Sequence, residues 1–170
     1  MEEFLRFLGF LNLQLRTLDI ARLERFMMPA SFSSLVGEFL DTAIPKYCPS
    51  LVKNRYHNGH PDLVPIDKFI NNSILHGDEG IEIKASRYKS GWQGHNAEAV
   101  WLMVFTFDAN GANEESAPRS FRFSGVYAAE LALDDWSFSG RSGTSRRTIT
   151  ASVKQSGATK MKSNWIYRAS

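Results

Sequence analysis

The sequence predicts an α/β (α+β) fold in which a mixed central sheet is flanked by helices from the N-terminal part. Apolar residues recur at helical spacing over roughly the first 45 positions, and short strand-like runs follow from residue 62 onward. The length of 170 residues and the hydrophobic share of 43% fit one globular domain with its own core. We therefore expect a single domain, 1–170, with a helical part at 1–50, a central part at 60–108 and a basic part at 136–170.

Two helices are expected in the helical part. The first runs from Phe4 to Met28, with apolar residues on one face, and Pro29 ends it because proline breaks the hydrogen-bond ladder. The second spans about 32–44 and has Ser31 or Ser33 as its N-cap. The first helix is more apolar than one buried stripe requires, so it serves either the core or a dimer interface.

The strands expected after the helices differ in how deeply they are buried. The run 99–107 is nearly all apolar, which is typical of a central strand covered on both faces. The run 81–86 alternates polar and apolar residues, as a half-buried strand does. Further strands are expected at 62–65, 120–133, 147–153 and 164–168, a short helix or turn at 66–75, and loops at 50–60, 87–97 and 108–118.

The charge is divided unevenly along the chain. Residues 1–135 hold 13 Lys/Arg and all 18 Asp/Glu, whereas residues 136–170 hold 7 Lys/Arg and no acid. A segment of one sign can bind a polyanion such as DNA, or it can simply be a solvated surface. The residues expected to contact DNA phosphates are Arg141, Arg146, Arg147 and Lys154.

Compartment signals favour the cytoplasm. Cys48 is the only cysteine, so no internal disulfide can form, and a reducing environment suits the chain. The start, Met1-Glu2-Glu3, is acidic where a secretory signal would be basic. No apolar run approaches the length that spans a bilayer, so we expect no membrane association.

Asp62, Glu82 and Lys84 form the candidate catalytic constellation. Glu82 and Lys84 are two apart in a strand, so their side chains emerge on the same face. Asp62 precedes a second short apolar run, which could bring it beside Glu82. Two carboxylates suit Mg²⁺, with the backbone carbonyl of Ile83 as a further oxygen ligand, and Lys84 could stabilise charge on a phosphate or orient the attacking water. Alone, the Glu-x-Lys pair is also typical of an exposed strand face.

These residues resemble the PD-(D/E)xK nuclease superfamily, and in particular type II restriction endonucleases. Pro61-Asp62 matches the first half of the signature and Glu82-Ile83-Lys84 matches the second. The surrounding sequences at 60–65 and 80–87 are also similar to those of restriction-type nucleases. The resemblance implies a restriction-endonuclease-like mixed sheet, Mg²⁺ as cofactor with Mn²⁺ able to substitute, and cleavage of double-stranded DNA by a homodimer. A cognate methyltransferase would be a separate chain that this sequence does not reveal.

Accessory residues have two interpretations each. Glu38 on the second helix could stand near the metal, as acidic residues of early helices do in some restriction enzymes, or it could be solvated. Gln93, His95 and Asn96, in the loop after the Glu-x-Lys strand, could touch DNA or position water. The same side chains could equally hydrogen-bond to the backbone and order that loop.

Two other functions compete with the restriction-type nuclease. His57, His60, Asn71 and His76 are also compatible with a His-Asn-His nuclease, which requires two short strands followed by a helix that carries a metal-binding histidine. A DNA-binding module without catalysis would use the basic C-terminal part alone. In that case Asp62, Glu82 and Lys84 should not converge in the folded chain.

Overall fold

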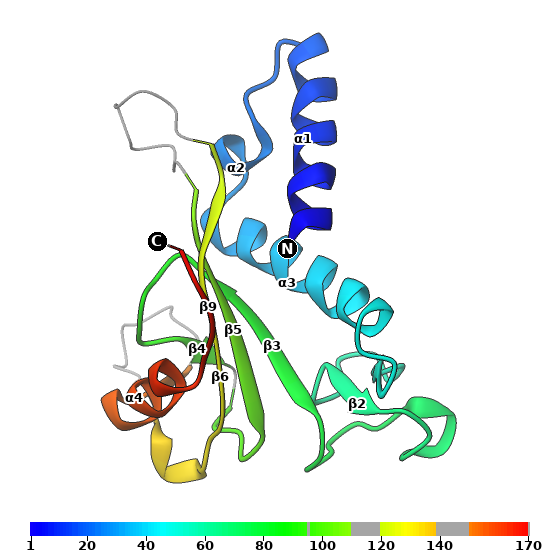
Figure 1. The fold of residues 1–170 in the computed structure, drawn as a ribbon, viewed down its shortest axis with the longest axis vertical. Coiled ribbons are helices and arrows are strands. Elements are labelled where there is room, and N and C mark those ends of the chain that lie inside the picture. The colour runs from blue at the N-terminus through cyan, green and yellow to red at the C-terminus, as the bar shows by residue number, and fades with distance from the viewer. Residues whose placement is uncertain (95, 110–119, 139–149, 170) are drawn as a thin grey trace, which may run out of the picture.

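The computed structural model describes residues 1–94, 96–109, 120–138 and 150–169 (Figure 1). Its helices are α1 (Glu2–Thr17), α2 (Leu23–Phe26), α3 (Pro29–Ala43) and α4 (Gln155–Ser163), with 3₁₀ turns η1 (Ile44–Lys46), η2 (Ile70–Asn72) and η3 (Leu133–Asp135). Its strands are β1 (Leu51–Lys53), β2 (Leu63–Pro65), β3 (Ile81–Ser86), β4 (Gln93–Gly94), β5 (Trp101–Asp108), β6 (Arg122–Glu130), β7 (Trp136–Phe138), β8 (Ala151–Val153) and β9 (Trp165–Arg168).

A six-stranded mixed sheet organises the molecule. Its strand order is β1-β2-β3-β5-β6-β9, in which β3 and β5 run parallel and the other neighbours are antiparallel. A second, three-stranded sheet has the order β4-β8-β7. The α+β architecture with a mixed sheet, predicted from the sequence, is confirmed.

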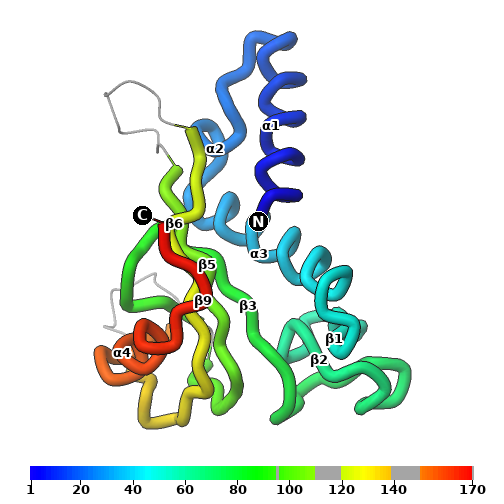
Figure 2. Tube along the Cα trace, viewed as in Figure 1, coloured from blue at the N-terminus to red at the C-terminus, as the bar shows by residue number. Residues whose placement is uncertain are grey.

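Each face of the central sheet has its own core, and β5 contributes to both. On one face Ile83, Phe105 and Phe107 pack with apolar residues of α1 and α3. On the other face Leu102 and Val104 pack with Trp92, Trp136 and residues of β8 and α4. The tube in Figure 2 shows α3 passing beside β3, and α4 lying near β9. The prediction that 99–107 is a central strand covered on both sides is therefore confirmed.

The expected first helix is wrong in its length. Helix α1 ends at Thr17, and Asp19 takes a positive φ of 55°, which ends helical geometry because non-glycine residues rarely extend a right-handed helix from there. Pro29 does not end a helix but begins α3, where the missing N–H of proline costs nothing. The N-cap is Met28, so the expected caps Ser31 and Ser33 are also wrong.

The apolar start of the chain serves the core and also leaves exposed surface. Phe4 and Leu8 are fully buried against the sheet, while Leu5 and Phe10 are exposed. The structure thus shows the core role, and the dimer role stays a prediction. Among the described residues, no helix combines the length and the apolar character needed to cross a bilayer.

The sequence missed several short elements. Strand β1 lies within 50–60, expected to be a loop, and β4 and β7 were not expected. Helix α4 was also missed because only Gly157, Ala158 and Met161 are buried, too few for a recognisable stripe. The expected strand at 147–153 is described only from residue 150, and β8 occupies Ala151–Val153.

Candidate metal and catalytic site

The site forms at an edge of β3 that β2 leaves open. The ladder between the two strands consists of one pair, Leu63 with Ile81, so β2 diverges before Glu82. Asp62 directly precedes β2, and its Oδ2 accepts a hydrogen bond of 2.8 Å from the Ile83 N–H. In an extended strand the N–H and C=O of one residue point to the same side, so the Ile83 carbonyl also faces this edge.

Glu82 and Lys84 lie on one face of β3, as their spacing predicts. The Lys84 ammonium donates to Glu82 Oε1 at 2.7 Å, and His60 Nδ1 lies 2.9 Å from Glu82 Oε2. Gly94 of β4 packs against the lysine: a Cβ at this glycine would stand 3.3 Å from Lys84 Cε. The absence of a side chain at Gly94 therefore leaves room for the ammonium.

Glu82 is a permanent anion held by two basic groups. Burial by itself would raise the pKa of Glu82, but the hydrogen bond from His60 and the charge of Lys84 outweigh it and lower the pKa to about 2. Burial would likewise lower the pKa of Lys84, yet the carboxylates of Glu82 and Glu98 raise it overall. Lys84 is therefore an ammonium at neutral pH.

Asp62 behaves in the opposite way. Burial raises the pKa of Asp62, the neighbouring charge of Glu82 raises it further, and the opposing hydrogen bond from Ile83 is too weak, so the pKa reaches about 7. The carboxylates of Asp62 and Glu82 are therefore close enough to repel each other, and the positive charges nearby do not fully offset this repulsion at Asp62. A cation placed beside Asp62 would relieve this cost.

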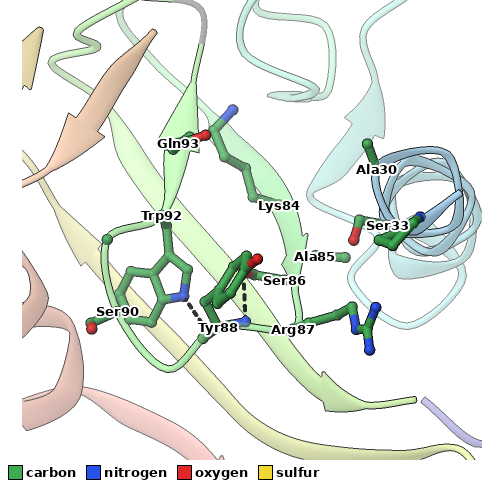
Figure 3. A pocket seen from close by; sticks show the side chains of 12 residues that line it. Ala30, Ser33, Lys84, Ala85, Ser86, Arg87, Tyr88, Ser90, Trp92 and Gln93 are labelled. Carbon is green, nitrogen blue, oxygen red and sulfur yellow. Dashed lines mark hydrogen bonds between the residues drawn. The ribbon is translucent and has the colours of Figure 1, made fainter. Parts of the chain in front are cut away.

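A cavity of about 310 Å³ brings the predicted residues together. We call it the Asp62 cavity; its walls include Glu82 and Lys84 from β3, Asp62 directly before β2, Gln93 from β4, and Glu38 from α3. A larger cavity of about 700 Å³ shares Lys84 and Gln93 with it and is drawn in Figure 3. In that view Lys84 and Gln93 point toward one another, at the side of the pocket away from Arg87.

Asp41 is a carboxylate of this site that the sequence analysis missed. It also lines the Asp62 cavity and is 4% exposed, and burial raises its pKa although the Lys53 ammonium lies 2.9 Å away. Glu38, the predicted accessory acid, has a 71% exposed side chain and pairs with the same lysine at 3.0 Å. Asp41 follows Glu38 by one helical turn, and this spacing was the signal that could have found it.

Of the remaining predicted site residues, Asn96 and Lys154 are described, and neither lines the Asp62 cavity. Asn96 lines a third cavity of about 230 Å³, here called the His76 cavity, together with His60, His76 and Glu98. Lys154 donates through Nζ to the Asp134 carbonyl. The predicted residues His95, Arg141, Arg146 and Arg147 lie outside the described residues.

The arrangement of the histidines does not match a His-Asn-His nuclease. Between His57 and His76 the structure has the three-residue strand β2 and the short turn η2, and no α-helix that carries a histidine occurs in this described segment. His57 is exposed, whereas His60 contacts Glu82. The histidine that matters to the site is therefore His60, directly before the Pro-Asp dipeptide.

The described geometry thus combines oxygen donors, an ammonium and a partly buried carboxylate of raised pKa beside one open strand edge, which defines a candidate cation and phosphate site. Comparisons with protein-family models, with curated proteins and with solved structures found no match to this chain. Its function must therefore be argued from the site itself.

Proposed function

We propose that this protein is a Mg²⁺-dependent endonuclease of the restriction-endonuclease-like class, which hydrolyses phosphodiester bonds of double-stranded DNA. The observation that carries the proposal is the convergence of Asp62, Glu82 and Lys84 on one cavity beside the open edge of β3. The non-catalytic alternative expects these three side chains to lie apart. Cutting both strands at one specific site would most simply use a homodimer.

The donor atoms fit Mg²⁺. Asp62, Glu82 and the Ile83 carbonyl would supply hard oxygen ligands, which this ion prefers, and Asp62 gains most because its ionised form is otherwise disfavoured. When bound, the ion would lower the pKa of a water molecule and neutralise charge on the phosphate. Mn²⁺ accepts the same ligands and should substitute.

The state of Lys84 defines its role. Because its pKa is raised, the side chain is a proton donor and a positive charge rather than a general base. Its Nζ would hydrogen-bond a non-bridging phosphate oxygen and stabilise the charge that builds there. The carboxylate of Glu82 keeps the ammonium in place through the 2.7 Å hydrogen bond.

Contact with DNA would extend from this site to the basic C-terminal part. In its described portion Lys160 pairs with Asp135 at 2.6 Å, and Arg168 donates to the Lys162 carbonyl, so these two residues support the fold. Lys154, whose Nζ donates to a backbone carbonyl, is the described residue that we expect to contact a phosphate. The arginines between 141 and 147 are expected to add further contacts.

The test is cleavage of genomic DNA long enough to contain every short recognition sequence many times, with Mg²⁺ and with EDTA. We expect discrete fragments with Mg²⁺ only. Lys84→Ala should lower the rate by about 100-fold or more, while Lys89→Ala, an exposed lysine five residues along, should not. Intact DNA under all conditions, or equal cutting by both variants, would contradict the proposal.

A further inference from the structure

The carboxylates of Glu82 and Glu98 lie between one imidazole and one ammonium. Glu82 presents Oε1 to Lys84 at 2.7 Å and Oε2 to His60 Nδ1 at 2.9 Å. Glu98 presents Oε2 to Lys84 at 4.0 Å and Oε1 to His60 Nδ1 at 3.8 Å. Each carboxylate therefore turns one oxygen toward the lysine and the other toward the histidine.

The three atoms on the histidine side have the spacing of metal ligands. Bonds of about 2.0–2.2 Å to a transition-metal ion separate neighbouring ligand atoms by about 3–3.5 Å. The distances from His60 Nδ1 to the two glutamate oxygens, 2.9 and 3.8 Å, bracket that range. His60, Glu82 and Glu98 each offer one ligand atom within 4.8 Å of the others. Small side-chain shifts would suffice to close the shell.

Charge and access also suit a cation here. Two carboxylates, of Glu82 and Glu98, face the single ammonium of Lys84, in a place where the glutamate and histidine side chains are at most 20% exposed. The His76 cavity leads to this side and brings His60 and Glu98 next to His76 and Asp78. Its volume of about 230 Å³ has room for water that would complete the coordination.

We propose that His60 Nδ1, Glu82 Oε2 and Glu98 Oε1 form a binding site for a divalent transition-metal ion of the Zn²⁺ class. The imidazole ligand selects such an ion over Mg²⁺, which prefers oxygen ligands alone. The ion would take the place of the hydrogen shared by His60 and Glu82, and any Nδ1 proton would leave to solvent. This site goes beyond the proposed nuclease: it shares Glu82 with the Mg²⁺ position but lies toward the His76 cavity instead of Asp62.

Isothermal titration calorimetry of the full chain, freed of metal with EDTA and dialysed, tests the site with Zn²⁺ alone. We expect one ion per chain, and a rise in melting temperature with Zn²⁺ that equimolar Mg²⁺ does not give. His60→Gln and Glu98→Gln should each weaken Zn²⁺ binding by more than about 10-fold. The matched control His57→Gln, an exposed histidine three residues away, should bind like wild type.

Circular dichroism of each variant keeps the comparison interpretable if one substitution disturbs folding, since the other still tests the site. The proposal is overturned if wild type binds no Zn²⁺, or if a folded His60→Gln or Glu98→Gln variant binds it as tightly as the His57→Gln control. Asp62→Asn separates this inference from the nuclease: it should abolish cleavage while Zn²⁺ binding persists. If wild type binds Zn²⁺ but, freed of Zn²⁺ and given Mg²⁺, does not cleave DNA, only the nuclease proposal is contradicted.

Discussion

Replacing Asp62 with asparagine should stabilise the metal-free protein at alkaline pH, although it removes a proposed metal ligand. The pKa of Asp62 in the folded chain is about 7, against an ordinary value of 3.8, because the carboxyl is buried and faces the Glu82 charge. Asparagine is uncharged and nearly the same shape, and its Oδ1 can still accept the Ile83 N–H. Only the cost of ionising Asp62 should therefore change.

The magnitude follows from linkage between protonation and folding. Between pH 3.8 and 7 the folded state holds more protons than the unfolded state, so this group lowers the free energy of unfolding as pH rises. Raising the pKa of Asp62 from 3.8 to about 7 corresponds to about 4 kcal/mol of unfolding free energy. Relaxation of the site reduces this figure, so we expect Asp62→Asn to gain about 1–4 kcal/mol at pH 8. Only well below pH 3.8, where Asp62 is protonated in both states, should the two proteins be equal.

Urea unfolding in EDTA at pH 4.5 and pH 8, with wild type and Asp62→Asn side by side, measures the effect. Asp134→Asn, which neutralises an exposed carboxylate on η3, is the matched control and should show no such gain. Added Mg²⁺ at pH 8 should stabilise wild type and leave Asp62→Asn unchanged. If Asp62→Asn gains nothing at pH 8 relative to pH 4.5, Asp62 does not lie in a buried site beside Glu82, and the reasoning fails.

Three further substitutions test the stability of the fold and the role of the predicted accessory acid. Gly80→Ala should destabilise the chain by about 3 kcal/mol or more, measured by urea unfolding, because Gly80 has a φ of 141° and a Cβ would collide with the Leu63 carbonyl oxygen. Asp135→Asn should cost about 1 kcal/mol at pH 7. The Lys160 hydrogen bond lowers the pKa of Asp135 in the folded chain. Its contribution to stability is therefore complete above the ordinary aspartate pKa and is lost as the pH falls through the lowered pKa of the folded state, which urea unfolding at pH 7 and pH 3 checks. Glu38→Gln should leave the cleavage rate within about twofold, because an exposed ion pair contributes little.

The sequence predicted the parts of the fold that local pattern determines. Alternation located β3 to the residue, and a continuous apolar run located β5 as the strand between the two cores. The same period of two placed Glu82 and Lys84 on one face, which the 2.7 Å hydrogen bond now shows. These features depend on neighbours along the chain, so one sequence was enough.

What the sequence could not predict depends on contacts between distant residues. Glu98, just before β5, lies near His60 because β5 pairs with β3, whose Glu82 contacts His60, and no local pattern predicts that pairing. Asp41 reaches the site because α3 packs beside β3. Pro29 was ambiguous in principle, because proline both ends helices and begins them, and only tertiary packing decides between the two.

The two carboxylates of the signature have different tasks because their surroundings differ. Glu82, between His60 and Lys84, is ionised at every working pH, so it can hold the ammonium and offer oxygens to a cation at any time. Asp62 has a pKa of about 7, so its carboxyl is only partly ionised at neutral pH, and a bound cation would favour the ionised form and thereby couple deprotonation to metal binding. Such a site gains cation affinity because the bound cation removes the free-energy cost of ionising Asp62 beside Glu82, which the metal-free protein bears. For this reason we regard Asp62, more than Glu82, as the residue whose substitution reports metal binding most directly.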